Sequence, residues 1–331
     1  MQLISQPADP SPLFGENLFV FEGADAATST EIAFHLADGT LLGARRYAGR
    51  GSIATSPNAY VNRTLHPVPH HFDRSTIERA EGRDVELYVA YNNGADRSSA
   101  ILFTASHDNL SFGSAMGPTD TRRIISPGEW DEISILAPRG ARLELTAVLS
   151  DGTTPILLSS RVTPERGVWL VSVVADVILA FSSTPADVEW FDVNVSCGGS
   201  LLTTVRYHLE EAPRDAVRLA WLNPRGYISY HTFRGSATEQ VASRRTEAPS
   251  YEGTTTLSLD GWRELKLVST PLPRSEVARV GEVATSPRVW RIYPDGTAVP
   301  HTLLSGAVRS LGPSAHTVEL TLRPSKTTTY W

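Results

Sequence analysis

Cysteine is almost absent from this chain of 331 residues, because Cys197 is the only one. A single cysteine excludes an intrachain disulfide, so stability must come from hydrophobic cores or from assembly. The pattern around Cys197 is typical of a strand end, and we expect a structural residue there rather than a catalytic thiol. Lysine is nearly as scarce, since Lys266 and Lys326 are the only two among 30 basic residues. Arginine, which suits bidentate contacts, therefore supplies most of the positive charge.

The sequence also lacks a surplus of positive charge and a long hydrophobic run. The formal net charge is −6, whereas a general nucleic-acid binder normally has a basic surplus. The longest apolar run, residues 168–181, contains Ser172 and Asp176 and is too short to span a bilayer. The first seven residues do not have the pattern of a secretory signal. These absences predict a protein that is made in the bacterial cytoplasm and either stays there or leaves as part of a particle (virion). They also predict no nucleic-acid partner and no membrane insertion.

Common catalytic motifs are missing as well. No G-x-S-x-G, H-E-x-x-H, Walker A or G-x-G-x-x-G arrangement occurs where its chemistry would need it. Asp187, Glu189 and Asp192 have the residue types of a glycosidase carboxylate pair. However, Glu189 and Asp192 are three residues apart, which places them on opposite faces of a regular strand. We therefore expect no enzyme, no catalytic residue and no cofactor.

One histidine cluster deserves comparison with metal sites. His66, His70, His71 and Asp73 have side chains that bind zinc or iron. Their spacing matches no site carried on a helix, and two prolines between them impose an irregular path. We expect a polar loop rather than a metal centre, and we expect this loop to have a structural role at a subunit contact.

What the sequence does contain is a succession of short strand signals separated by turns. Its hydrophobic fraction of 41% and charged fraction of 20% suit a folded globular protein. Apolar and polar residues alternate in many segments, and several end in Asp-Gly or Asn-Gly, which favours sandwiches or barrels. We predict an all-β fold with minor α content, built from two β-sandwich-like domains. The expected strands include residues 18–21, 31–36, 41–47, 85–91, 100–104, 133–135, 143–149, 156–158, 168–175, 177–181, 205–209, 217–222, 228–233 and 318–322.

Three further segments organise the expected fold. A polar interruption rich in Pro and Gly at residues 162–167 predicts a boundary between domains 1–163 and 164–331. Residues 235–253 are polar without periodicity, which predicts an exposed loop that serves either as an interaction arm or as a plain surface excursion. Residues 275–284 have the pattern of a short helix with Ser275 as its cap.

The most distinctive segment is Trp221-Leu222-Asn223-Pro224-Arg225-Gly226, followed by Tyr230, Thr232 and Phe233. It predicts a strand, a tight turn and a second strand, because Pro and Gly provide the turn backbone. A short helix and Ser286-Pro287-Arg288-Val289-Trp290 follow further along. The structural signature of this region comprises Trp221, Asn223, Gly226, Tyr230, Phe233, Ser286, Pro287 and Trp290.

This W-L-N-x-x-G-x-x-x-Y-x-T-F hairpin, with its closing helix and S-P-x-V unit, resembles tail and baseplate-type structural proteins of phages or prophage-derived particles of Bacteroidetes-like bacteria. The resemblance covers about residues 217–322 and implies a structural subunit of a tail or tail-like particle. Such a subunit would form a ring-like homo-oligomer and would also contact other particle proteins. Sheet edges, loops and terminal arms would make the contacts, and residues 2–14 and 323–331 are candidate arms.

A second hypothesis is a carbohydrate-binding β-sandwich, either free or at a tail tip where it would bind a host-surface glycan. Six aromatic residues have side chains that stack on sugars: Trp190, Trp221, Tyr227, Tyr230, Trp262 and Trp290. An exposed row of them on one sheet face would favour this hypothesis, whereas burial would indicate core packing. A glycoside hydrolase ranks last, because it needs a cleft with two facing carboxylates.

Overall fold

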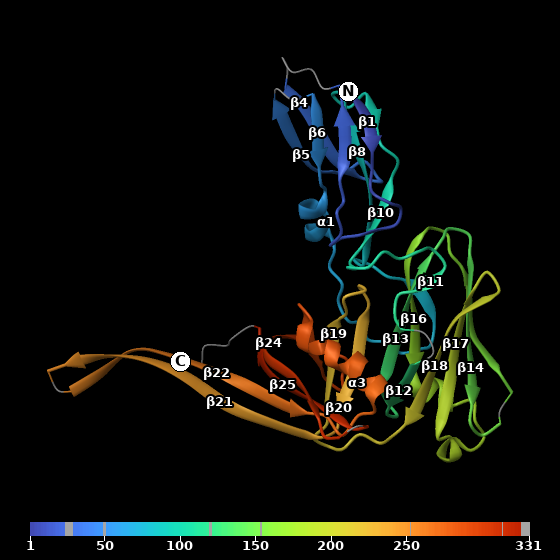
Figure 1. The fold of residues 1–331 in the computed structure, drawn as a ribbon. Helices are drawn as coiled ribbons and strands as arrows, with labels where there is room; N and C mark the ends of the chain where they lie inside the picture. Colours follow the sequence, from blue (N-terminus) through green and yellow to red (C-terminus); the bar gives the residue numbers. More distant parts are fainter. Residues whose placement is uncertain are drawn as a thin grey trace.

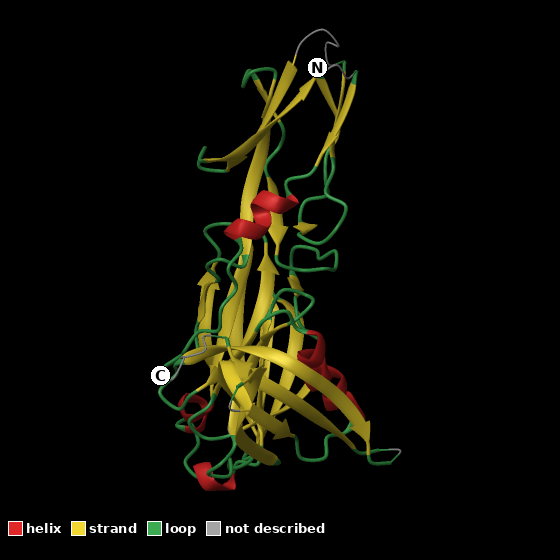
Figure 2. Ribbon diagram, turned by 90° about the vertical axis from the view of Figure 1, so that its left-hand side faces the viewer, coloured by secondary structure: helices red, strands yellow, loops and turns green. Residues whose placement is uncertain are grey.

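The computed structural model describes residues 1–23, 29–48, 51–118, 121–152, 154–251, 253–312 and 314–325 (Figure 1). It confirms the expected all-β class with minor α content, since strands make up most of the regular structure (Figure 2). The described residues contain three short α-helices, α1 (Asn58–Thr64), α2 (Ala175–Leu179) and α3 (Arg274–Gly281). No helix in these ranges is long and apolar enough to cross a membrane.

The first unit lies at one end of the molecule, with the N-terminus at its tip (Figure 1). One sheet has the order β1-β3-β6 and the other β2-β10-β8-β4-β5, with β9 paired to β8. Four phenylalanines, Phe19, Phe21, Phe34 and Phe103, are buried in its core. The strands are β1 (Gln2–Ser5), β2 (Ser11–Pro12), β3 (Phe19–Glu22), β4 (Ser29–Leu36), β5 (Leu41–Ala48), β6 (Ser52–Thr55), β8 (Asp84–Tyr91), β9 (Asp96–Arg97) and β10 (Ile101–Thr104).

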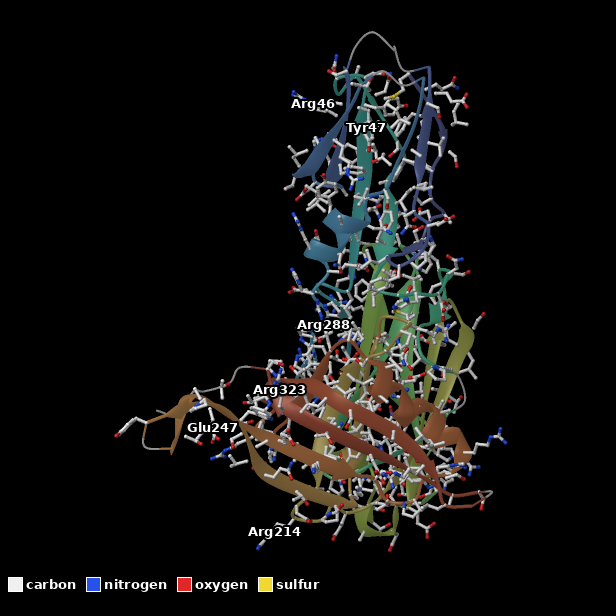
Figure 3. The ribbon with its side chains drawn as sticks, turned by 60° about the vertical axis from the view of Figure 1, so that its left-hand side comes forward. Arg46, Tyr47, Arg214, Glu247, Arg288 and Arg323 are labelled. Carbon is white, nitrogen blue, oxygen red and sulfur yellow. The ribbon has the colours of Figure 1, made fainter. Side chains whose placement is uncertain are left out.

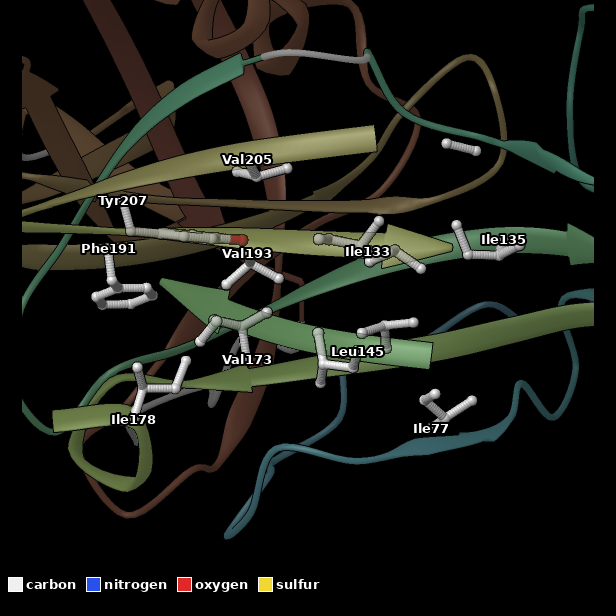
Figure 4. Packing of buried hydrophobic residues seen from close by; sticks show 14 of the residues in the cluster. Ile77, Ile133, Ile135, Leu145, Val173, Ile178, Phe191, Val193, Val205 and Tyr207 are labelled. Atoms are coloured by element: carbon white, nitrogen blue, oxygen red, sulfur yellow. The ribbon is translucent and has the colours of Figure 1, made fainter. Parts of the chain in front are cut away.

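The second unit contains two further sheets, ordered β11-β13-β16-β7 and β12-β18-β17-β14-β15. Alternating residues from both sheets meet in one apolar core, seen from close by in Figure 4. Ile133 and Ile135 come from one sheet and Phe191, Val193 and Tyr207 from the other. The strands are β7 (Ile77–Arg79), β11 (Ser114–Ala115), β12 (Thr121–Ile125), β13 (Trp130–Ala137), β14 (Arg142–Leu149), β15 (Ile156–Val162), β16 (Gly167–Val174), β17 (Trp190–Cys197) and β18 (Ser200–Leu209).

The third unit is a seven-stranded sheet with the order β20-β19-β23-β24-β25-β22-β21. Helix α3 and the 3-10 helix η2 (Glu282–Thr285) supply Val277, Val280 and Val283 to a core with Leu219 and Trp221 of this sheet. The strands are β19 (Val217–Leu222), β20 (Ile228–Phe233), β21 (Ser236–Ser250), β22 (Gly253–Val268), β23 (Val289–Ile292), β24 (Ala298–Ser310) and β25 (His316–Pro324).

The predicted signature hairpin is confirmed. Strands β19 and β20 pair antiparallel from Val217 opposite Phe233 to Leu222 opposite Ile228. The turn between them has a hydrogen bond from Gly226 N to the Asn223 carbonyl at 2.8 Å. The predicted helix near 275–284 is also present as α3 and η2, but it begins at Arg274 with Pro273 in the N-cap position. Ser275 therefore lies inside the first turn and not at the cap.

Strand pairing crosses the boundary expected between residues 163 and 164. The polar segment is the connection between β15 and β16. Strand β16 pairs with β13 over its whole length, from Trp130 opposite Val174 to Ala137 opposite Gly167. Strand β14 likewise pairs with β17, which follows the connection. The Pro/Gly interruption therefore turns the chain from one sheet of the unit to the other, because both sheets need strands from either side of it.

One expected strand is absent. Residues 177–181 do not form a strand, since Ala175–Leu179 is helix α2, followed by a short hydrogen-bonded turn. A short apolar run does not distinguish a buried strand from a buried helix. Ile178 of this run is buried on the helix. Strand β17 begins at Trp190 and directs Phe191, Val193 and Val195 inward.

A second difference concerns residues 235–253, which we expected to be a loop. They contain β21, paired with β22 from Ser236 opposite Val268 to Ser250 opposite Gly253. Backbone hydrogen bonds hold these strands together along their length. Because this hairpin extends from the body of the molecule (Figure 1), neither face has to be apolar, and the sequence shows no strand periodicity there.

Candidate functional site: the buried junction and the projecting hairpin

A buried ion pair lies where the three units meet. Arg83, immediately before β8, donates two hydrogen bonds to the carboxylate of Glu132 on β13, and the Nη2 to Oε2 distance is 2.9 Å. Both side chains are completely buried. Arg83 also donates to Ser134 Oγ at 3.1 Å and to the Val68 carbonyl at 3.2 Å. The Arg83 guanidinium, which comes from the first unit, is thus held by side chains of the second unit.

The third unit contacts the same carboxylate. The backbone N–H of Ile228 donates to Glu132 Oε1 at 3.3 Å, and the Tyr230 hydroxyl donates to Oε2 at 3.4 Å. Both residues belong to β20. Burial, together with the Glu132 charge, raises the pKa of Tyr230 well above its usual value, so its hydroxyl remains a donor. One carboxylate therefore joins all three units.

Strand β13 makes this arrangement possible because both of its faces are buried. Ile133 and Ile135 face the core of the second unit, whereas Trp130 and Leu136 belong to a separate core shared with the third unit. Side chains alternate along a strand, so Glu132 lies on the face directed at the third unit.

Three neighbouring charged groups surround the junction. Arg123 Nη1 donates to Asp131 Oδ2 at 2.6 Å, and Tyr207 donates to the same oxygen at 3.0 Å. Burial by itself would lower the pKa of Arg123, but the Asp131 carboxylate raises it above its ordinary value. Glu129 lies 3.0 Å from Arg218 Nη1 on β19, another link between the second and third units.

The third group involves His231 on β20 and helix α3. Arg279 donates to the Tyr230 carbonyl at 2.9 Å and to Glu276 at 3.2 Å. His231 Nδ1 lies 3.8 Å from Glu276 Oε1. Burial lowers the pKa of His231 well below its usual value, and the nearby positive charges of Arg279, Arg234 and Arg218 lower it further. His231 is therefore neutral near pH 7.

The structural signature surrounds the same junction. Trp221 and Phe233 belong to the core beneath α3, whereas Tyr230 and Trp290 belong to the core shared with the second unit. Ser286 Oγ donates to the Leu222 carbonyl at 2.8 Å, which ties the S-P-x-V segment to the end of β19. The signature residues therefore have packing and bridging roles, and Pro287 is exposed.

The hairpin turn also contacts the end of the first unit. His107 N donates to the Pro224 carbonyl at 2.8 Å. Gly226 has φ +83°, and a Cβ built there would lie 2.7 Å from the Ala105 carbonyl oxygen. Glycine is required on both counts, because other residues rarely adopt this φ and would also collide with backbone. Asn223 donates to Glu282, which fixes the other side of the turn.

The structure does not arrange the six candidate sugar-stacking aromatics as an exposed row. Trp221, Tyr227, Tyr230 and Trp290 are all buried. Trp190 lies beneath the Arg206 guanidinium, with 3.8 Å between the guanidinium carbon and the ring centroid. These contacts are typical of core and surface packing.

The candidate carboxylates and histidines likewise make local contacts. Asp192 accepts two 2.7 Å hydrogen bonds from Arg206 on the neighbouring strand. His71 Nε2 lies 3.0 Å from Asp73 Oδ1, and the His71 ring meets the Trp130 ring edge-on. Within the described ranges, no three His, Cys, Asp or Glu side chains are placed to hold a metal ion. Cys197 ends β17, and burial raises the pKa of its thiol.

A surface groove lies between η2, β23 and β24, with a volume of about 580 Å³. Its lining includes Ser286, Pro287, Arg288, Trp290, Pro300 and His301. The second half of the signature thus contributes to this groove as well as to the core.

The most prominent surface element is the hairpin of β21 and β22, which we call the projecting hairpin (residues 236–268). Strand β22 pairs with β25 only from Leu265 to Val268. Beyond this base, the two strands pair only with each other within the described chain. Figure 3 shows Glu247 on the part of the hairpin that extends beyond the body of the molecule. Val241 is 78% exposed and Tyr251, at the tip, is fully exposed.

The expected N-terminal arm is not free. Strand β1 pairs with β3, and β2 pairs with β10 in its own unit. The Phe14 ring stacks on His107, with 4.1 Å between the ring centroids. In the expected C-terminal arm, Arg323 and Pro324 end β25, while residues 326–331 lie outside the described residues.

Comparisons with known proteins add little to this description. No protein family and no curated protein matches the sequence. Among solved structures, one similar chain is described as "Biofilm associated protein - BSP domain", with 12% sequence identity and a TM-score of 0.18. The match covers 63% of this chain and 30% of that chain. A likeness this low carries no argument about function.

We predict that Arg83→Met and Glu132→Leu each lower the free energy of unfolding by about 3–5 kcal/mol, because each leaves a buried charge without its partner. The double variant should lose less than the sum of the two single losses, because it leaves neither charge behind. Chemical denaturation of all four proteins measures this coupling. Strict additivity would show that the pair does not interact energetically.

We predict that acid destabilises the protein through His231. Its pKa is lowered in the folded state, whereas the unfolded value is about 6.5, so below that pH the unfolded chain binds a proton that the native state does not. The free energy of unfolding should fall with decreasing pH, by at most about 1.4 kcal/mol per pH unit for this residue.

Chemical denaturation of the protein and of His231→Gln between pH 7 and 5 measures this fall in the free energy of unfolding. Loss of the titrating group should make the variant's profile shallower. His301→Gln is a parallel variant, since burial also lowers the pKa of His301 outside the junction, and its profile should be shallower than that of the protein as well. Parallel profiles for the protein and His231→Gln would contradict the assignment.

Proposed function

We propose that this protein is a structural subunit of a phage tail or tail-like particle, which assembles with other copies and with other particle proteins. The projecting hairpin is the observation that supports this proposal most. A two-stranded hairpin is at best marginally stable in water by itself. Its open edges also present unpaired backbone groups to other chains. An extended hairpin of this kind is a suitable element for binding a neighbouring subunit.

The rest of the molecule supports a mechanical role. Glu132 of the second unit accepts hydrogen bonds from the Arg83 guanidinium of the first unit and from two neutral donors of the third, Ile228 N–H and the Tyr230 hydroxyl, so the units are held in one arrangement. Removal of Arg83 or of Glu132 leaves an uncompensated buried charge, which is strongly unfavourable. The hairpin therefore projects from a rigid base, as an assembly element must if it is to reach a neighbour at a defined angle.

The matched variant for this proposal shortens the projecting hairpin. Glu239 stands opposite Leu265 at its base, so replacing residues 240–264 with Asn-Gly should close a tight turn between them. Because the removed strands pair only with each other, we expect this variant to retain the thermal unfolding transition of the body. Its assembly should be lost.

We predict that the full chain co-sediments with particles from a culture that produces them, and that antibody labels one end of a tail in electron micrographs. The shortened variant should be folded by circular dichroism but absent from the particle fraction. If the full chain stays in the soluble fraction and no particle carries label, the proposal fails. Equal incorporation of both chains would exclude the hairpin as the assembly element.

A further inference from the structure

We propose that the tip of the projecting hairpin binds in the surface groove of a second copy of this chain, with the Tyr251 ring in the groove and Glu247 paired with Arg288. This inference rests on the proposed role of the projecting hairpin in assembly and names both surfaces of the contact. The tip and the groove are different surfaces, so the contact is heterologous. Each copy offers its tip to one neighbour and its groove to another, which builds a ring or a filament.

The first observation is the character of the groove between η2, β23 and β24. At about 580 Å³ it has the size of a ligand-binding cleft. Its hydroxyls already have partners, because Ser286 Oγ donates to the Leu222 carbonyl and the Thr302 and Ser325 hydroxyls lie 3.2 Å apart. A sugar would therefore bury hydroxyls that it cannot pair, whereas an apolar ring would not. Much of the remaining lining is apolar: Val68, Pro287, Val289, Pro300 and Leu303.

The second observation is that two polar side-chain groups of the groove lack a partner. The Arg288 guanidinium makes no hydrogen bond or ion pair with the described residues, and no Asp or Glu is among those that line the groove. His301 is only 6% exposed. Its Nδ1 lies 2.9 Å from the Val299 carbonyl, which can only accept, so Nδ1 carries the proton and Nε2 is an acceptor. Burial lowers the pKa of His301, so the ring stays neutral near pH 7.

The third observation concerns the tip of the projecting hairpin. Tyr251 lies between β21 and β22 and is fully exposed. Glu247 is also exposed, and it makes no hydrogen bond or ion pair with the part of the chain that the structure describes. Phe14 and Phe181, at 49% and 51% exposure, are the other exposed aromatic side chains in the described ranges. Both lie on the body of the molecule, and Phe14 is already stacked on a histidine ring.

The groups at the tip complement those of the groove. The Tyr251 ring packs against the prolines of the groove, and its hydroxyl donates to His301 Nε2. The Glu247 carboxylate pairs with the Arg288 guanidinium, so a cation without an acid meets an acid without a cation. Such charge complementarity fixes the register of a contact and favours the correct partner. An exposed tyrosine that enters an apolar groove is also a common source of binding energy.

The length of the projecting hairpin excludes the groove of its own chain as the binding site. Strands β21 and β22 remain paired from the base to Ser250 opposite Gly253. The stretch from Glu239 to Ser250 spans about 36 Å at about 3.3 Å per residue. The groove is formed by strands of the body, from which the hairpin extends (Figure 1). A paired ladder of this length does not fold back on its base, so the tip meets another molecule.

Complementation between two variants tests the contact. We expect the isolated full chain to form oligomers that grow with protein concentration in sedimentation velocity. Tyr251→Ala removes the tip anchor and Arg288→Glu reverses the groove charge, so each should raise the dissociation constant at least about tenfold. Each variant alone should be monomeric where the unchanged chain is oligomeric. Their equimolar mixture should form a dimer, because the first retains its groove and the second retains its tip.

Matched controls lie outside both surfaces. Phe181→Ala removes an exposed aromatic ring, and Arg214→Glu reverses an exposed arginine. Both should assemble as the unchanged chain does. Formation of the mixed dimer also shows that the two test variants are folded. A mixture that stays monomeric would overturn the inference, as would oligomers that Arg288→Glu leaves unchanged.

Charge exchange provides an independent prediction. Glu247→Arg sets arginine against arginine in the proposed contact, so we expect the dissociation constant to rise at least about tenfold, as for Arg288→Glu. The double variant with Glu247→Arg and Arg288→Glu should recover most of the affinity, because opposite charges face each other again. Sedimentation equilibrium measures all four proteins. A double variant as weak as the single variants would show that these two side chains do not meet.

These outcomes separate the inference from the proposed function, because none of them depends on particles. A chain that stays monomeric by itself but enters the particle fraction would retain the proposed function and overturn the inference. Mixed dimers from a chain that never enters particles would retain only the inference.

Discussion

The ion pair between Arg83 and Glu132 is the constraint on which the arrangement of the units depends. Both side chains are completely buried, and taking each ion out of water costs several kcal/mol. Only a full set of partners offsets that cost. Glu132 has this set when Arg83 from the first unit and Ile228 and Tyr230 from the third are in place together. Separation of any unit would leave a charge buried and incompletely paired, so the three units hold one another in position.

The projecting hairpin has the opposite physical character. At the junction, side chains are buried on both faces of β13 and β20. In the hairpin, backbone pairing continues beyond Leu265, where the contact with β25 ends, and Val241 remains exposed. A rigid junction and a hairpin that extends beyond the rest of its sheet support the structural role in assembly that we propose.

Local patterns predicted some elements well and missed others for identifiable reasons. The hairpin of the strands expected at 31–36 and 41–47 depends on an Asp-Gly turn, and the hairpin of β19 and β20 depends on Asn-Pro-Arg-Gly. The structure contains both hairpins. Helix α2 was missed because its short apolar run fits a buried strand equally well. The projecting hairpin was missed because a strand with solvent on both faces has no apolar side to generate a period.

By itself, the sequence determined the all-β class, many strands, the short helix near residue 275 and the signature hairpin, because turn chemistry and side-chain alternation act over a few residues. Only the tertiary structure decided that Arg83 meets Glu132, 49 positions away. It also decided that Tyr227 and Tyr230 are buried instead of displayed on a surface. Alternation shows that a strand has two faces. Which faces meet depends on how distant sheets pack, and no local pattern of residues contains that information.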